Sequence, residues 1–229
     1  MKSVIWDFNG TILDDVELAT RSMNELLRRR ELPTIDKATH RQVFRFPVSD
    51  YYRHLGFDLD REVQRDISDE FHSVYQAGIG SCSLNPGIAE TLEYLEKHGI
   101  DQFVLSAAQE EMVVSWVRIH GIQDRFKGVY GLSDRLAVSK EQRCRELIED
   151  FDLDPSRTLF IGDTDHDVEV ARAVGCLPLV VLQGHQDKFR FAGAECEIYD
   201  SFHDLVKALP VDGTAGRLSY TMYTVRVTG

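Results

Sequence analysis

The chain has few cysteines, few prolines and no long hydrophobic run. Its 229 residues include four cysteines and six prolines. The cysteines lie far apart with no Cys-x-x-Cys pair, which argues against a zinc site or a disulfide framework and favours reduced thiols. No apolar stretch approaches the roughly 20 residues that span a membrane, and Asp7 interrupts the N-terminus before a signal-peptide core could form. We therefore expect a cytoplasmic protein without a membrane anchor.

Positive charge is also scarce. Lys and Arg number 26 against 38 Asp and Glu, which gives a formal net charge of −12. Such a chain repels the phosphates of nucleic acids and of anionic membranes, so we expect neither as a partner. An anionic substrate would need a local cation or a metal. The length and the hydrophobic fraction of 43% suit one sizeable globular domain, or a core that carries a smaller one.

The organising stretch is an apolar run that stops at a carboxylate. Residues 4–6 favour a buried strand, which should end at Asp7 or Phe8 because Asp and Gly are poor strand residues. This strand would place Asp7 at the sheet edge where open α/β proteins bind ligands. Asn9-Gly10 permits another interpretation, a tight hairpin in which Asp7 only caps a turn. No alternating strand follows, however, and Asp14-Asp15 instead predict the start of a helix.

Two kinds of hydrophobic periodicity divide the rest of the chain. Residues 16–82 show helical spacing with breaks at Pro47 and Gly56. Residues 80–85 read as a linker, and Asn85 should cap the next helix. Strands then alternate with helices, which is typical of a parallel sheet. The predicted fold is α/β, a Rossmann-like parallel sheet core (residues 1–15 and 83–210) with an inserted all-helical cap domain (residues 16–82). Residues 211–229 form a C-terminal tail, rich in β-formers.

Several polar residues fall at predicted strand ends or helix starts. In chain order they are Asp7, Asn9, Thr11, Ser106, Lys140, Asp163 and Asp167. They resemble the four motifs of the haloacid dehalogenase superfamily, which are Asp-x-Asp-x-Thr, a strand-terminal Ser or Thr, a Lys, and Gly-Asp-x-x-x-Asp. The motifs occur in order over roughly residues 1–210. The helical insertion resembles the C1-type cap of the phosphoglycolate phosphatase-like branch.

The resemblance implies a Mg²⁺-dependent phosphatase that forms an aspartyl phosphate on Asp7. It implies metal binding by Asp7, Asn9, Asp163 and Asp167, catalytic roles for Asp7, Asn9, Ser106 and Lys140, and substrate binding by Gly10, Thr11, Ser106, Ala107 and Arg45. These residue types suit phosphoryl transfer, because Mg²⁺ prefers oxygen ligands and a fixed cation stabilises the transferring oxygens. Arg45 would meet an anionic tail of the substrate, although a polar face of a cap helix explains it equally well. His185 is a weak candidate for the rim of the site.

Asn9 departs from the family pattern. Most phosphatases of the superfamily have an Asp there that protonates the leaving group, and an amide cannot shuttle a proton. Loss of a general acid commonly removes about 10²–10⁴ in rate. Three accounts stay open: a substrate with a good leaving group, such as an acyl phosphate; a slow ordinary phosphatase; or a protein that binds phosphate without useful turnover. We predict hydrolysis of a small phosphorylated metabolite by a monomer or homodimer, with a phosphate-binding or regulatory protein as the rival class.

Overall fold

The computed structural model describes residues 1–132 and 139–209. Six strands form one parallel sheet in the order β5-β4-β1-β6-β7-β8. Their bounds are β1 Ser3–Trp6, β4 Asp101–Gln109, β5 Gly128–Leu132, β6 Thr158–Gly162, β7 Leu177–Val181 and β8 Glu197–Tyr199. The predicted α/β fold class is confirmed. The tail at residues 211–229, with its β-rich stretch, lies outside the described residues.

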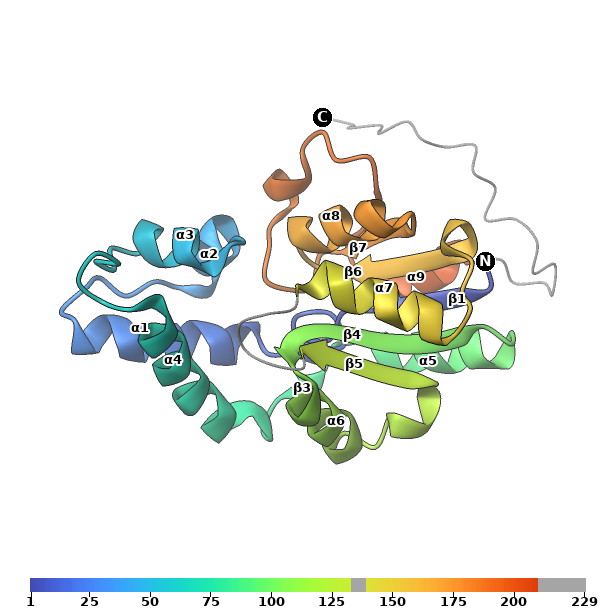
Figure 1. Cartoon of the computed structure of the whole chain (residues 1–229), viewed down its shortest axis with the longest axis horizontal. Coiled ribbons are helices and arrows are strands. Elements are labelled where there is room, and N and C mark those ends of the chain that lie inside the picture. The colour runs from blue at the N-terminus through green and yellow to red at the C-terminus, as the bar shows by residue number, and fades with distance from the viewer. Residues whose placement is uncertain (133–138, 210–229) are drawn as a thin grey trace.

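Helices cover both faces of this sheet, and four more form a separate group to one side (Figure 1). The covering helices are α5 Ile88–Lys97, α6 Glu110–Ile119, α7 Lys140–Asp150, α8 Asp165–Val174 and α9 Phe202–Ala208. The separate group, called the cap below, comprises α1 Val16–Arg29, α2 Lys37–Val43, α3 Val48–His54 and α4 Gln64–Ile79. Three 3-10 turns lie at Gln123–Arg125, Pro155–Arg157 and Lys188–Phe191. Within residues 1–132 and 139–209, no helix has the length and apolarity needed to cross a membrane.

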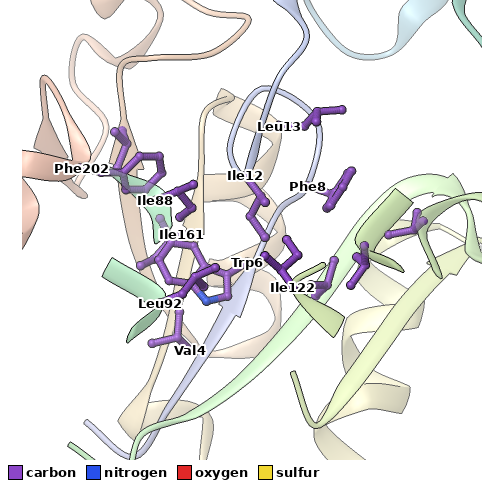
Figure 2. Packing of buried hydrophobic residues seen from close by; sticks show 14 of the residues in the cluster. Val4, Trp6, Phe8, Ile12, Leu13, Ile88, Leu92, Ile122, Ile161 and Phe202 are labelled. Atoms are coloured by element: carbon purple, nitrogen blue, oxygen red, sulfur yellow. The ribbon is translucent and has the colours of Figure 1, made fainter. Parts of the chain in front are cut away.

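The alternation of side chains along β1 separates two hydrophobic cores. Val4 and Trp6 point to one face, where they pack with residues of α5, α6 and α9 (Figure 2). Ile5 points to the other face, which is covered by α7 and α8. Burial on both faces explains why β1 and β6 read as continuous apolar runs. The central position of β1 holds its carboxyl end rigidly between β4 and β6.

The cap has a hydrophobic core of its own. Met23, Leu26 and Leu27 of α1 pack there with Tyr51 and Tyr52 of α3, and all five are buried. This explains the helical spacing seen in the sequence, because a helix of the cap must bury one stripe against its neighbours. The exact boundaries given above for core and cap stay a prediction.

The chain enters and leaves the cap through a short two-stranded ribbon that the sequence analysis did not foresee. Leu13–Asp14 (β2) pairs antiparallel with Ser83–Leu84 (β3), and β3 lies inside the segment predicted to be a linker. Asn85 does not cap α5, whose N-cap is Gly87. Its amide instead donates to the carbonyls of Gly10 and Thr11, both at 2.8 Å. The prediction failed because buried carbonyls of the first loop need donors that a local pattern cannot reveal.

Strand β4 is longer than predicted. It continues past Ser106 to Gln109, and its register against β5 shifts between Leu105 and Gln109. Such a bulge re-aims side chains at the end of a strand. Ser106 therefore lies inside an irregular strand, and its hydroxyl accepts a hydrogen bond from the backbone N–H of Ala108 at 3.0 Å.

Candidate active site

Three carboxylates meet at the carboxyl edge of the sheet. Asp7 follows β1, Asp163 follows β6, and Asp167 lies in the first turn of α8. All three are buried, and oxygen atoms of the three side chains lie within 4.8 Å of one another. Neighbouring parallel strands end side by side, which brings together Asp7 and Asp163 although they are 156 positions apart in the sequence.

Lys140 enters this cluster from the start of α7. Its ammonium group pairs with Asp7, and it also donates to Asp167 Oδ1 at 2.7 Å. Lys140 is 5% exposed, and its Nζ lies 5.5 Å from the centre of the Phe160 ring. A buried ammonium needs such partners, since an unpaired buried charge costs several kcal/mol. The structure thus brings Lys140 next to Asp7, two residues that the sequence placed in one site, and the catalytic role of Lys140 stays a prediction.

Local hydrogen bonds hold the other two carboxylates in place. Asp167 Oδ2 accepts from the Thr164 hydroxyl at 2.6 Å and from the Thr164 N–H at 3.0 Å, as the N3 residue of a capping box. Asp163 accepts from the Thr11 hydroxyl at 3.0 Å and from the His185 N–H at 2.5 Å. A side chain on Gly10 would lie 2.4 Å from Asp163 Oδ2, and Gly10 has φ +79°, so only glycine fits this close approach.

The electrostatics of the cluster favour a divalent cation. Burial raises the pKa of Asp7 to about 8 despite Lys140, and burial raises the pKa of Asp163 to about 6. Burial also acts on Asp167, but Lys140 and Thr164 hold the pKa of this carboxyl below its usual value. When all three carboxylates are ionised, as metal ligands must be, they and the one ammonium leave two negative charges in a buried site. Its oxygen donors and its charge fit Mg²⁺, which could be held by Asp7, Asp163 and Asp167.

Asn9 lies beside the carboxylate of Asp15, which is not part of the three-carboxylate cluster. Its amide nitrogen donates to the Tyr75 hydroxyl at 2.8 Å and to Asp15 Oδ2 at 3.3 Å, while its oxygen accepts from Ser106 Oγ at 3.4 Å. Asp15 was expected to cap α1, but it makes no side-chain cap bond. Instead its carboxylate accepts from the Gly10 N–H at 2.7 Å and from Tyr75. An amide suits position 9 because it donates to both acceptors.

His185 belongs to the buried site and not to its rim. Its Nε2 is 3.2 Å from Asp15 Oδ1, and its Nδ1 is 3.0 Å from His40 Nε2. Burial alone would lower the pKa of His185, but the Asp15 carboxylate outweighs burial and raises this pKa to about 9. His40 comes from α2 and continues the chain of hydrogen bonds to the Tyr51 hydroxyl at 2.8 Å. These contacts connect the cap to the core.

Asp15, Tyr75 and His40 were not predicted as site residues from the sequence, and His185 was predicted only as a weak candidate for the rim. His185 follows the apolar strand β7, so the strand-end rule that selected Asp7 and Asp163 applied to it as well. Tyr75 and His40 carry no such signal, because each occupies an ordinary position on a cap helix. Only the contact between cap and core brings them to the site.

The expected substrate-binding residues do not all face the same space. Ser106 and Ala107 line the cavity described next. Thr11 is 1% exposed and is engaged with Asp163, and the Gly10 N–H is engaged with Asp15. Arg45 donates from Nε to the Val43 carbonyl at 2.9 Å and does not line this cavity. The substrate-binding roles of these five residues stay predictions.

A cavity of about 230 Å³ extends from the carboxylate cluster to the inner side of the cap. Its floor contains Asp7, Asn9, Lys140 and Asp163. Its other walls come from the cap and from α6, with rings of Phe44, Tyr51, Tyr75 and Trp116. A small molecule bound there would place one end at the buried charges and the other among aromatic side chains.

Buried carboxylates at the ends of parallel strands, with a helical cap over the cavity beside them, define a capped hydrolase built on a parallel sheet. A family model described as haloacid dehalogenase-like hydrolase matches residues 4–181. The chain belongs to this family, which confirms the family predicted from the sequence, and its enzyme class is that of a phosphatase.

Similar proteins include several phosphoglycolate phosphatases. The one from Synechococcus elongatus is 24% identical over 194 residues, which cover 82% of this chain and 87% of that protein. The one from Xanthomonas campestris pv. campestris is 26% identical, over 81% of this chain and 85% of that protein. Among solved structures, a predicted phosphatase from Clostridium acetobutylicum has a TM-score of 0.79 at 20% identity, covering 90% of this chain and 97% of that chain. At that identity the likeness concerns the fold.

Proposed function

We infer that the protein is a Mg²⁺-dependent phosphohydrolase that cleaves a small phosphorylated metabolite through an aspartyl phosphate on Asp7. The observation that carries this proposal is the buried cluster of Asp7, Asp163 and Asp167 around the Lys140 ammonium. Phosphoglycolate-like monoesters and acyl phosphates are the candidate substrates. The related proteins are named phosphoglycolate phosphatases, which supports a small phosphorylated molecule as the class of substrate.

Each side chain has a defined task in this proposal. An oxygen of Asp7 attacks phosphorus, and the bond from phosphorus to the leaving oxygen breaks. Lys140 stabilises negative charge on Asp7 and on the transferring oxygens, and Ser106 donates a hydrogen bond. Bound Mg²⁺, held by Asp7, Asp163, Asp167 and the main-chain carbonyl of Asn9, would neutralise the phosphoryl group. Water then attacks phosphorus of the aspartyl phosphate and restores the Asp7 carboxylate.

Asn9 limits the first step. Its amide can donate a hydrogen bond to the leaving oxygen but supplies no proton. Asp15 does not replace the missing acid, since burial is outweighed by His185 and Tyr75, which keep the pKa of Asp15 below its usual value. An acid with a lowered pKa has no proton to give at neutral pH. Both ring nitrogens of His185 are engaged, with Asp15 and with His40. The leaving group therefore departs as an anion or takes its proton from water.

The decisive experiment is a phosphatase assay with p-nitrophenyl phosphate, with Mg²⁺ and with a chelator. We expect turnover only with Mg²⁺, and a phosphoenzyme in acid-quenched samples whose phosphate hydroxylamine releases. Asp7→Asn should abolish both signals, whereas the matched control Asp14→Asn on the same segment should keep them. Asp14 does not line the cavity. Turnover retained by Asp7→Asn would exclude the aspartyl-phosphate mechanism.

Because Asn9 supplies no proton, a second function remains a candidate, that of a phosphate-binding or regulatory protein on this scaffold. The same quench experiment separates the two. A stable phosphoenzyme, or bound phosphate, with no more than one product molecule released per protein favours the regulatory protein. Repeated turnover favours the phosphatase.

A further inference from the structure

The cavity has two chemically different ends. All of its carboxylates, together with Lys140, gather at the sheet, where a phosphoryl group would bind. Away from the sheet, rings dominate the wall: Phe44 and Phe46 after α2, Tyr51 and Tyr52 of α3, Phe71 of α4 and Trp116 of α6. The part of the substrate that is not phosphate must therefore contact aromatic faces and edges.

The hydroxyl groups in this wall are already engaged. Tyr51 bonds His40 Nδ1 at 2.8 Å, Tyr52 bonds Ser68 at 3.3 Å, and Tyr75 donates to Asp15. Their rings, and not their polar ends, are what a substrate meets. Aromatic side chains favour another ring in offset or edge-to-face contact by more than the burial of equal area provides.

The wall offers no obvious partner for a carboxylate tail such as that of phosphoglycolate. Among the described residues that line the cavity, Lys140 is the only lysine or arginine, and it is engaged with Asp7 and Asp167. Arg45 and Arg41 lie outside the lining and donate to backbone carbonyls, Arg41 to that of Leu182 at 3.0 Å. A carboxylate buried among the rings would lose its hydration without gaining an ion pair.

His40 and His185, which line the cavity near the carboxylates, do not provide a cation for such a tail. Burial lowers the pKa of His40 to about 3, so its ring is neutral. Both ring nitrogens of His185 are engaged, Nε2 with Asp15 Oδ1 at 3.2 Å and Nδ1 with His40 Nε2 at 3.0 Å. Neither of these two rings therefore offers an unpaired cation to an anionic tail. His72 of α4 also lines the cavity, where its ring lies 5.6 Å from the Phe71 ring.

Position 9 points to the same substrates on chemical grounds. A phenolate is a stable leaving anion, since a phenol such as the tyrosine side chain has a pKa of about 10, whereas alkyl alcohols are much weaker acids. Departure of an aryl oxygen thus needs little help from a general acid, and Asn9 offers none. The shape of the wall and the chemistry of the loop are independent observations.

We propose that the preferred substrates are phosphate monoesters of phenols, with the aromatic ring of the substrate between the cap rings and the phosphate at Asp7. This rests on the proposed function. Asp7 forms a bond to phosphorus while the bond from phosphorus to the aryl oxygen breaks, and the electron pair leaves on the phenolate, which takes a proton from water. Hydrolysis of the aspartyl phosphate then releases phosphate, so one water is consumed for each ester.

The test separates binding from turnover by using phosphonates, which the enzyme cannot hydrolyse. Titration calorimetry with saturating Mg²⁺ compares phenylphosphonate, methylphosphonate and phosphonoacetate. We expect phenylphosphonate to bind at least about tenfold tighter than either of the other two. Equal or tighter binding of phosphonoacetate would overturn the proposal, whether or not the protein turns over any ester.

Variants of the cavity wall test where the aromatic ring of the ligand binds. Phe44→Leu keeps an apolar side chain but removes the ring, and it should weaken phenylphosphonate about three- to tenfold while methylphosphonate is unchanged. Phe189→Ala is the control, because Phe189 is 79% exposed and lies outside the cavity. An equal effect of both variants, or none of Phe44→Leu, would contradict the proposed position.

Turnover completes the test. Phenyl phosphate should exceed phosphoglycolate in kcat/KM, and 4-methylphenyl phosphate should exceed 4-carboxyphenyl phosphate. A higher kcat/KM for phosphoglycolate would leave hydrolysis standing and refute the aromatic specificity. Tight binding of phenylphosphonate without turnover of any ester would support the aromatic site and count against the phosphohydrolase alone.

Discussion

Replacing Asn9 by aspartate tests the central feature of this loop. The amide nitrogen of Asn9 lies 3.3 Å from Asp15 Oδ2. Two like charges at that distance repel by about 5 kcal/mol at an effective dielectric constant of about 20, less whatever the His185 imidazolium cancels. This repulsion raises the pKa of the new carboxyl, which then keeps its proton near neutral pH. A protonated carboxyl at position 9 is the general acid that the parent lacks.

Asn9→Asp should therefore raise the hydrolysis of alkyl phosphates by a factor of about 10²–10⁴ and that of aryl phosphates much less. Both proteins are assayed at saturating Mg²⁺ with an alkyl and an aryl ester. Asn9→Ala serves as the control, because it removes the amide without adding an acid. An unchanged alkyl rate in a folded Asn9→Asp protein, or an equal gain in Asn9→Ala, would refute the argument.

The same substitution has a cost in stability that grows with pH. The new carboxyl has a raised pKa in the folded state, so the folded protein binds the proton more tightly than the unfolded chain does. Relative to the parent, the free energy of unfolding should fall as pH rises from about 4, where the unfolded carboxyl ionises. Adding Asp15→Asn removes the repulsion and should restore most of the loss. Urea unfolding at several pH values measures both effects.

Three further predictions concern the buried charges. Mg²⁺ should raise the thermal midpoint of the parent, and Asp163→Asn should reduce that rise; an equal rise in both would argue against Asp163 as a ligand. Tyr75→Phe should lower the free energy of unfolding by about 1–3 kcal/mol, because it removes one of the donors to the buried Asp15 carboxylate, whereas the control Tyr52→Phe should cost less. In the absence of metal, stability should fall as pH rises from about 6.5 to about 9, since the pKa of His185 is raised on folding and its proton is lost in that window; a pH profile unchanged in His185→Gln would disprove this origin.

Much of the fold was predictable because it is recorded in local patterns. Strands β1 and β6 are buried on both faces, so each reads as an apolar run that stops at a carboxylate. The helices of the cap each bury one stripe, so they read as helical periodicity. Strand limits were less certain. The continuation of β4 beyond Ser106 depends on pairing with β5, which local propensity does not contain.

The sequence by itself determined which groups lie at the sheet edge, because Asp7 and Asp163 each directly follow a buried strand, Lys140 begins a helix, and parallel strands must finish side by side. Tertiary structure alone decided what surrounds Asn9. Tyr75 lies 66 residues from Asn9, and His40 lies 145 residues from its partner His185. Neither contact leaves a periodic or spacing signal, because each depends on how the cap meets the core. The hydrogen bonds that fit an amide at position 9, and the aromatic wall opposite Asp7, are consequences of that meeting.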